Sequence, residues 1–218
     1  MDSLSPAEVR VLGSLIEKDI TTPDYYPLTL NALTNACNQS SNREPVMALG
    51  EQAIVEALNG LRERKLAFMF QGADSRVAKF GHRIAETFEL ERPETAVLCV
   101  LLLRGPQTPG EIRGRTGRMH EFANLEQTEA SLAKLMERTP EALAVKLPRQ
   151  AGTKEQRFAH LLGGAVAASA PQGLAQTEVP YVDSKEERIA RLEAEVSAMR
   201  AEVADLRGQL AELKAQLT

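Results

Sequence analysis

The side chains most suited to chemistry lie in one polar loop, residues 38–45. Its amide and guanidinium groups, on Asn38, Gln39, Asn42 and Arg43, can hydrogen-bond a phosphate or the backbone of a partner. The same residue types also cap helices and stabilise turns, because they bond to nearby backbone groups. The sequence leaves two interpretations open: a contact surface, or a loop that caps its flanking helices.

A second group of polar side chains is basic and lies further along the chain. The cations lie in and just after a predicted short helix, or in a predicted hairpin: Arg113, Arg115, Arg118, Arg149, Lys154 and Arg157. Between Glu91 and Gly164 there are eleven basic and nine acidic residues, a modest local excess of positive charge. These cations are candidates for contacts with nucleic-acid phosphates or with a partner. The alternative is an ordinary solvated, charged surface.

The sequence lacks the constellations that are typical of catalysis. It has no nucleophile beside a histidine and no glycine-rich phosphate loop. The three histidines are scattered, so we expect no metal site. Cys37 and Cys99 each lie in an apolar helical pattern, which predicts buried, reduced thiols. We therefore expect a protein that is not an enzyme and carries no metal or cofactor.

The overall composition is that of a globular protein without a membrane segment. The chain has 218 residues and a formal net charge of −4, whereas strong nucleic-acid binders usually carry a basic excess. The longest apolar run, residues 96–103, is far shorter than the roughly 20 residues that cross a bilayer. The first residues lack the pattern of a signal peptide, so we expect a cytoplasmic location and no membrane partner.

The first part of the chain predicts three helices followed by a hairpin. Ser5, Pro6 and Glu8 form a capping box before a helix that ends near residue 21. A second helix is expected from about Leu28 to Cys37, and a third over residues 51–65. Residues 66–70 and 77–80 are short segments rich in aromatic and apolar residues, and they predict the two strands of a hairpin. This order is that of a winged helix, a helix-turn-helix with an added hairpin.

The same pattern recurs after about 86 residues, which indicates an internal repeat. Helices are expected from residue 93, from the motif at residues 107–112 onward, and over residues 125–137, and a hairpin over residues 144–147 and 157–161. The predicted fold is therefore mainly α with small sheets (α+β), built from two tandem winged-helix domains and a C-terminal coiled-coil helix. The expected domains are residues 1–88 and 89–164.

The third helix of each predicted domain is acidic at its start. In a DNA-reading helix-turn-helix this helix enters the major groove. Glu51 and Glu56 fall on the first such helix, and Glu126 and Glu129 on the second. Because carboxylates are repelled by phosphates, these positions weigh against ordinary major-groove reading.

The C-terminal residues predict a coiled coil. A flexible linker, residues 165–185, precedes a segment, 186–218, in which apolar residues alternate at spacings of three and four. The apolar positions are Ile189, Leu192, Val196, Met199, Val203, Leu206, Leu210, Leu213 and Leu217. The β-branched residues Ile189, Val196 and Val203 fall at heptad position a, and leucine dominates position d. This combination favours a parallel dimer. The alternative is a helix that packs back onto its own domains.

Several motifs also resemble the YceH family of bacterial proteins. The segments that carry the resemblance are residues 21–33, 37–39, 42–47, 102–105, 107–111, 118–122 and 157–161. The resemblance covers roughly residues 4–164 and implies two tandem winged-helix domains. It implies no substrate and no mechanism.

Three functional hypotheses follow from the sequence. The leading one is a non-enzymatic homodimer in DNA-linked regulation, with duplex DNA contacted by the second domain's arginines and hairpin. The second is a scaffold that binds a protein partner and no nucleic acid, as the acidic third helices suggest. The third is an enzyme, which would need a pocket of convergent titratable groups.

Overall fold

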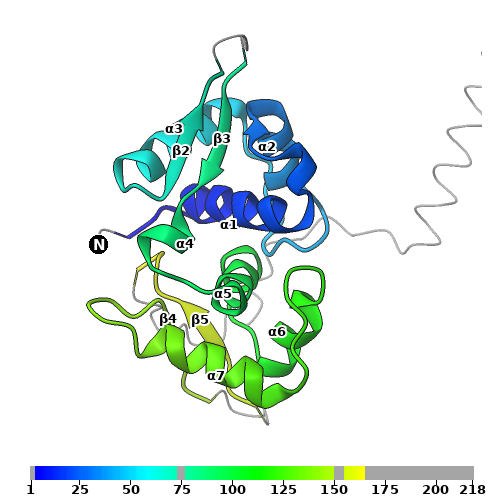
Figure 1. The fold of residues 1–218 in the computed structure, drawn as a ribbon, viewed down its shortest axis with the longest axis vertical. Helices are drawn as coiled ribbons and strands as arrows, with labels where there is room; N and C mark the ends of the chain where they lie inside the picture. The colour runs from blue at the N-terminus through cyan, green and yellow to red at the C-terminus, as the bar shows by residue number, and fades with distance from the viewer. Residues whose placement is uncertain (1–2, 73–76, 150–154, 165–218) are drawn as a thin grey trace, which may run out of the picture. The chain divides into compact units, whose positions relative to one another are not determined.

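The computed structural model describes residues 3–72, 77–149 and 155–164, which belong to one compact unit. Within these residues the protein is mixed α and β, with seven α-helices and two small antiparallel sheets (Figure 1). The predicted linker, the predicted coiled coil and Lys154 lie outside the described residues.

The first half runs from α1 to β3. Its elements are α1 (Pro6–Thr21), the 3-10 turn η1 (Pro23–Tyr25), β1 (Leu28–Thr29), α2 (Leu30–Cys37), α3 (Glu51–Glu63), β2 (Ala67–Phe70) and β3 (Lys79–His82). The predicted capping box is present, since the Ser5 hydroxyl accepts from the Glu8 amide and the Glu8 carboxylate accepts from the Ser5 amide. The strands form an antiparallel sheet in the order β1-β3-β2. The three predicted helices and the predicted hairpin are therefore present.

One boundary in this half was predicted wrongly. Leu28 was expected to open a helix, but Leu28 and Thr29 are extended and pair with Phe80 and Lys79 of β3. Thr29 is the N-cap of α2, and its hydroxyl accepts from the Ala32 amide. An N-cap residue takes an extended backbone conformation, so the helix cannot begin before Leu30.

The second half repeats this order of elements. After the short helix α4 (Ile84–Thr87), which was not predicted, come α5 (Arg92–Arg104), α6 (Pro109–Thr116), α7 (Leu125–Met136), β4 (Ala144–Lys146) and β5 (Phe158–His160). Strands β4 and β5 pair antiparallel. A single antiparallel bridge between Gln107 and Phe158 is the counterpart of the β1–β3 pairing in the first half. The predicted elements of this half are thus also present.

The core is built around α1 and α5. Figure 1 shows α1 between α5 and the sheet that contains β2 and β3. Val11, Leu12, Leu15 and Ile16 of α1 are fully buried. Every residue of α5 from Glu94 to Leu103 is buried, as expected for a helix that is apolar on all sides. Burial of each large apolar side chain contributes about 1.5–3 kcal/mol.

A glycine allows α1 and α5 to approach closely. A Cβ atom on Gly13 would lie 2.8 Å from Leu103 Cδ2 and 3.2 Å from Leu102 Cβ. The thiol of Cys99 donates to the Gly13 carbonyl at 3.5 Å. Cys37 and Cys99 are both free and buried, as predicted. One hydrophobic cluster spans both halves, and the predicted division at residues 88 and 89 stays a prediction.

The helices of the described ranges are too short or too polar to cross a bilayer.

Candidate functional site

Arg43 of the polar loop is buried and fully engaged. Its side chain has no exposed surface and forms a two-pronged ion pair with Glu17, at 3.2 and 2.6 Å. Its Nε and Nη2 atoms also donate to the Ala36 carbonyl at 3.1 and 2.9 Å. This guanidinium therefore holds the loop onto α1 and α2, and it offers no free donor to an external ligand.

Two further loop residues hold the loop in place. The Asn38 side chain donates to the Leu49 carbonyl at 2.9 Å and accepts from the Leu49 amide at 2.7 Å. The side-chain oxygen of Gln39 accepts from Arg43 at 3.1 Å. Of the four loop residues proposed as contacts, only Asn42 is exposed and turned toward another part of the fold.

Asn42 lies at a pocket with three arginines, which we call the arginine pocket. The Asn42 side-chain oxygen accepts a hydrogen bond from Arg104 at the end of α5. The pocket measures about 330 Å³, and its polar wall also includes Arg115 and Arg118. Val100, Leu103 and Met119 are among its apolar lining residues. The structure thus joins candidates from two distant segments in one site.

The ends of two helices place the arginines of the pocket. Helix α5 ends at Arg104, where Gly105 takes a positive φ of 68° and turns the chain. Helix α6 begins at a capping box, in which Thr108 and Glu111 bond to each other's backbone amides at 3.2 and 2.8 Å. Arg115 lies in the last turn of α6, and Arg118 lies just beyond it.

The three guanidiniums have few partners. Arg115 Nη1 is buried and has no hydrogen-bond partner within the described chain. Arg118 is exposed, and no hydrogen bond or ion pair joins it to the described residues. Burial, and then the positive charge of Arg115, lower the pKa of Arg104. The pocket therefore holds concentrated positive charge.

Glu17 is the carboxylate among the lining residues. Burial raises the pKa of Glu17, but the hydrogen bonds and charges of Arg43 and Lys18 together outweigh burial, so the net shift is downward. Lys18 also lies 3.4 Å from this carboxylate. Arg43 and Lys18 offset most of its charge, although Glu17 also acts on Arg104 and opposes the lowering of the Arg104 pKa.

The remaining predicted contact residues lie outside the arginine pocket. Arg113 donates to the carbonyls of Phe122 and Ala123, at 3.2 and 2.9 Å, and thereby fixes the turn between α6 and α7. Arg157 donates to the Pro106 carbonyl at 2.8 Å and pairs with Glu111 at 3.1 Å. Arg149 is exposed beyond β4.

Arg104 was missed by the sequence analysis. It follows an apolar helical run, where a single basic residue is expected simply to offset the negative end of a helix. Its position beside Asn42 depends on how α5 packs, and no local pattern in the sequence reports that contact.

The arrangement is suited to binding an oxyanion. Guanidinium groups donate several N–H bonds in a planar fork that matches phosphate and carboxylate oxygens. The arginines also offset the negative ends of α5 and α6, but the unpartnered Arg115 Nη1 leaves a donor unused. No acid–base pair is required for such binding, since it is purely electrostatic and geometric.

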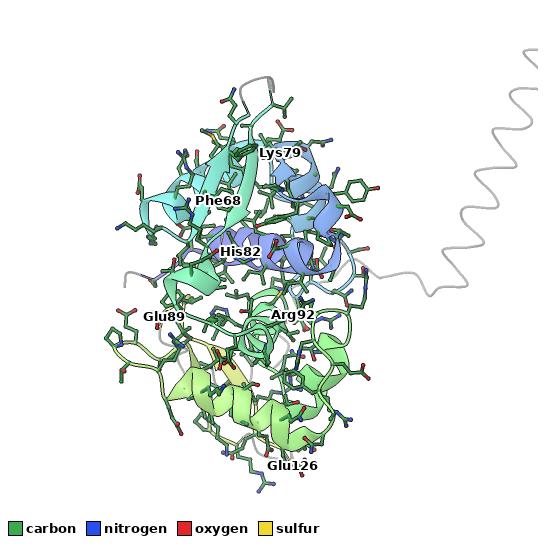
Figure 2. The ribbon with its side chains drawn as sticks, in the orientation of Figure 1. Phe68, Lys79, His82, Glu89, Arg92 and Glu126 are labelled. Carbon is green, nitrogen blue, oxygen red and sulfur yellow. The ribbon has the colours of Figure 1, made fainter. Side chains whose placement is uncertain are left out.

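The third helices carry a different chemistry. Glu51, Glu56, Glu126 and Glu129 are exposed on α3 and α7. Figure 2 labels Glu126, which lies in the first turn of α7. The carboxylates expected on these two helices are therefore exposed.

Metal binding finds no support in the described part of the chain. No group of three or more histidine, cysteine, aspartate or glutamate side chains gathers there as ligands.

Comparison with known sequences matches most of the chain to a protein family. The family described as "Protein of unknown function, DUF480" matches residues 4–153. A UPF0502 protein from Opitutus terrae is 58% identical over 180 residues, covering 83% of this chain and 77% of its own length. UPF0502 proteins from Pelobacter propionicus and Vibrio atlanticus are 54% and 47% identical, covering 88% of this chain and 88% and 90% of their own lengths.

Proposed function

The chain belongs to the DUF480 family, and we propose that it is a non-enzymatic, DNA-associated regulatory protein that holds backbone phosphates in the arginine pocket. The observation that carries this proposal is the cluster of Arg104, Arg115 and Arg118, with one buried donor unpartnered in the described structure. A phosphate oxygen supplies the acceptor that this donor lacks.

We assign each half to the winged-helix fold. The support is the repeated order of three helices followed by a hairpin, with β1 in the first half and the Gln107–Phe158 bridge in the second. A helix-turn-helix with a wing is a common scaffold for DNA binding. Fold alone does not set function, so the proposal depends on the arginine pocket.

The binding would be directed at phosphates more than at bases. Glu51 and Glu126 open the helices that would enter a major groove, and their charge opposes that approach. Phosphate contacts position a protein on DNA without reading its sequence. We therefore expect low sequence selectivity from the described unit and a strong dependence of affinity on salt.

Dimerisation is part of the proposal. The heptad segment 186–218 would pair two copies and present two arginine pockets to one duplex. Two linked sites raise the overall affinity through effective concentration. A DNA-linked role also fits the cytoplasmic location expected from the sequence.

Binding to labelled duplex DNA, followed by fluorescence anisotropy at low salt, tests the proposal. The wild-type protein should bind, and the double variant Arg115→Met/Arg118→Ala should bind at least about tenfold more weakly. Arg62→Ala, which removes an exposed arginine of α3, is the matched control and should bind as wild type does. Failure of the wild-type protein to bind at low salt would refute the proposal.

A second candidate function is a protein-interaction scaffold. The exposed carboxylates of α3 and α7 favour it, because they give the third helix of each half exposed negative charge. A basic protein partner would bind such helices with complementary charge. A charge reversal, Glu126→Lys with Glu129→Lys, should abolish capture of that partner while DNA binding stays unchanged or strengthens.

A further inference from the structure

A second cavity is lined by other residues of the loop that follows α2, and its chemistry differs from that of the arginine pocket. It measures about 260 Å³ and is lined by residues from the start of α1, residues 44–47, the end of α5 and the region of β5. Its apolar walls include Leu4, Val9 and Leu102, and its polar lining includes the buried Arg10 and the half-buried His160. We call it the Arg10–His160 cavity.

Arg10 is a buried cation that lacks an acidic partner. Its side chain donates to the carbonyls of Cys37, at 3.1 Å, and of Pro45, while its Nε atom is buried without a hydrogen-bond partner. The residue is 2% exposed, and no carboxylate within the described ranges pairs with it. Burial, and then the positive charge of Arg43, lower the pKa of Arg10. A buried charge without a counter-ion is unfavourable, so this site favours an anion.

His160 contributes a second unused polar atom. Its Nδ1 atom is buried and has no partner among the described residues. Burial lowers the pKa of His160 to about 4, so the ring is neutral near pH 7. A neutral imidazole presents one N–H donor and one acceptor, and it can donate to a ligand oxygen without adding charge.

Glu44 is the other ionisable group that lines the cavity. It is exposed, and its charge acts on Arg104, whereas it is not among the charges that shift the pKa of Arg10. The anionic head of a ligand would therefore lie at the buried end of the cavity, beside Arg10, and away from Glu44.

The size of the cavity limits the ligand. Its volume lies between the roughly 150 Å³ cavity that takes up benzene and the roughly 300 Å³ at which ordinary ligand pockets begin. From the unpartnered donors, the apolar walls and this volume, we propose that the Arg10–His160 cavity binds a small free carboxylate with an apolar body. This inference does not depend on DNA binding.

Calorimetric titration of the full chain with sodium benzoate tests the inference, with benzamide as the uncharged analogue. We expect saturable binding of one benzoate per chain and binding of benzamide weaker by about ten- to a hundredfold, the range of a hydrogen bond to a charged group. Absence of saturable benzoate binding, or equal binding of benzamide, overturns the proposal.

Two variants locate the binding. Arg10→Met removes the donor and should weaken benzoate binding by about ten- to a hundredfold. Gly163→Leu keeps every polar group and fills the cavity, because a Cβ at Gly163 lies 3.3 Å from His160 Cε1 and 3.7 Å from Val9 Cγ2. It should also reduce binding, whereas Arg62→Met should not. If Arg10→Met does not fold, Gly163→Leu decides: unchanged binding overturns the proposal.

A carboxylate could also come from the C-terminus of a peptide. A short apolar peptide with a free C-terminus and the same peptide with an amidated C-terminus distinguish the two sources. Benzoate binding tighter than the free-acid peptide supports a free small acid. The opposite order, with the amidated peptide inactive, assigns the cavity to a chain terminus and overturns the free-acid proposal.

Discussion

Two buried arginines fix the loop between α2 and α3. The Arg43 guanidinium donates hydrogen bonds to the Ala36 carbonyl and to the Glu17 carboxylate. The Arg10 guanidinium donates to the carbonyls of Cys37 and Pro45. Carbonyl groups that would otherwise lack partners at the end of α2 are thereby satisfied. Polar side chains of the loop thus hold it in place, while the exposed Asn42 lines the arginine pocket.

Removal of Arg43 should strongly destabilise the fold. Arg43→Ala leaves the partly buried Glu17 with Lys18 as its one remaining cation within the described chain, and loss of one member of a buried ion pair costs about 3–5 kcal/mol. Urea denaturation of wild type and variant measures this change in the free energy of unfolding. The exposed Arg62→Ala should change it by less than about 0.5 kcal/mol. Equal small effects for both variants would contradict the structural role of Arg43.

His160 should make stability depend on pH. Its folded pKa, about 4, lies below the unfolded value of about 6.5, so the unfolded chain takes up a proton first as the pH falls. Stability is then complete above about pH 6.5 and falls toward pH 4, by at most about 3 kcal/mol. The free energy of unfolding at several pH values should decline between about pH 6.5 and 5, above the range of ordinary carboxylates. His160→Gln should flatten this decline, and an identical decline in both proteins would contradict the burial of His160.

At the scale of elements, the contact between α1 and α5 joins the two halves. It depends on Gly13, because any side chain there would enter the space of Leu103. The helix propensity of alanine favours Gly13→Ala by about 1 kcal/mol, whereas overpacking of a close contact costs about 1–3 kcal/mol.

Gly13→Ala should therefore lower the melting temperature. Gly110→Ala, in the first turn of α6, is the matched control, because a Cβ there has no atom within 4 Å. The control should leave the melting temperature unchanged or raise it slightly. A rise in both variants, measured by calorimetry, would show that α1 and α5 are not closely packed.

The sequence predicted the elements better than their contacts. Capping signals and apolar periodicity located both hairpins and every α-helix of the described residues except the short α4, because these signals act over a few residues. The short pairing of Leu28 and Thr29 with β3 was missed, since it depends on a strand about fifty residues away. The arginine pocket was predicted only in pieces, as Asn42, Arg115 and Arg118, because tertiary packing alone brings them to Arg104.

At the scale of the whole molecule, the heptad segment predicts a dimer. Val203→Asp places a charge at a seam position and should convert the dimer to a monomer, as measured by sedimentation velocity. Ser197→Asp, at a position one residue after the seam, is the control and should remain dimeric. A monomeric wild-type protein at micromolar concentration would contradict the predicted coiled coil.

The salt dependence of DNA binding tests the arginine pocket most directly. The logarithm of the association constant of the wild-type protein for duplex DNA should fall linearly with the logarithm of salt concentration. Arg118→Ala should reduce the slope by about one, the effect of one lost phosphate contact, whereas Arg62→Ala should leave it unchanged. The same slope and affinity for wild type and Arg118→Ala would show that DNA phosphates do not bind in this pocket.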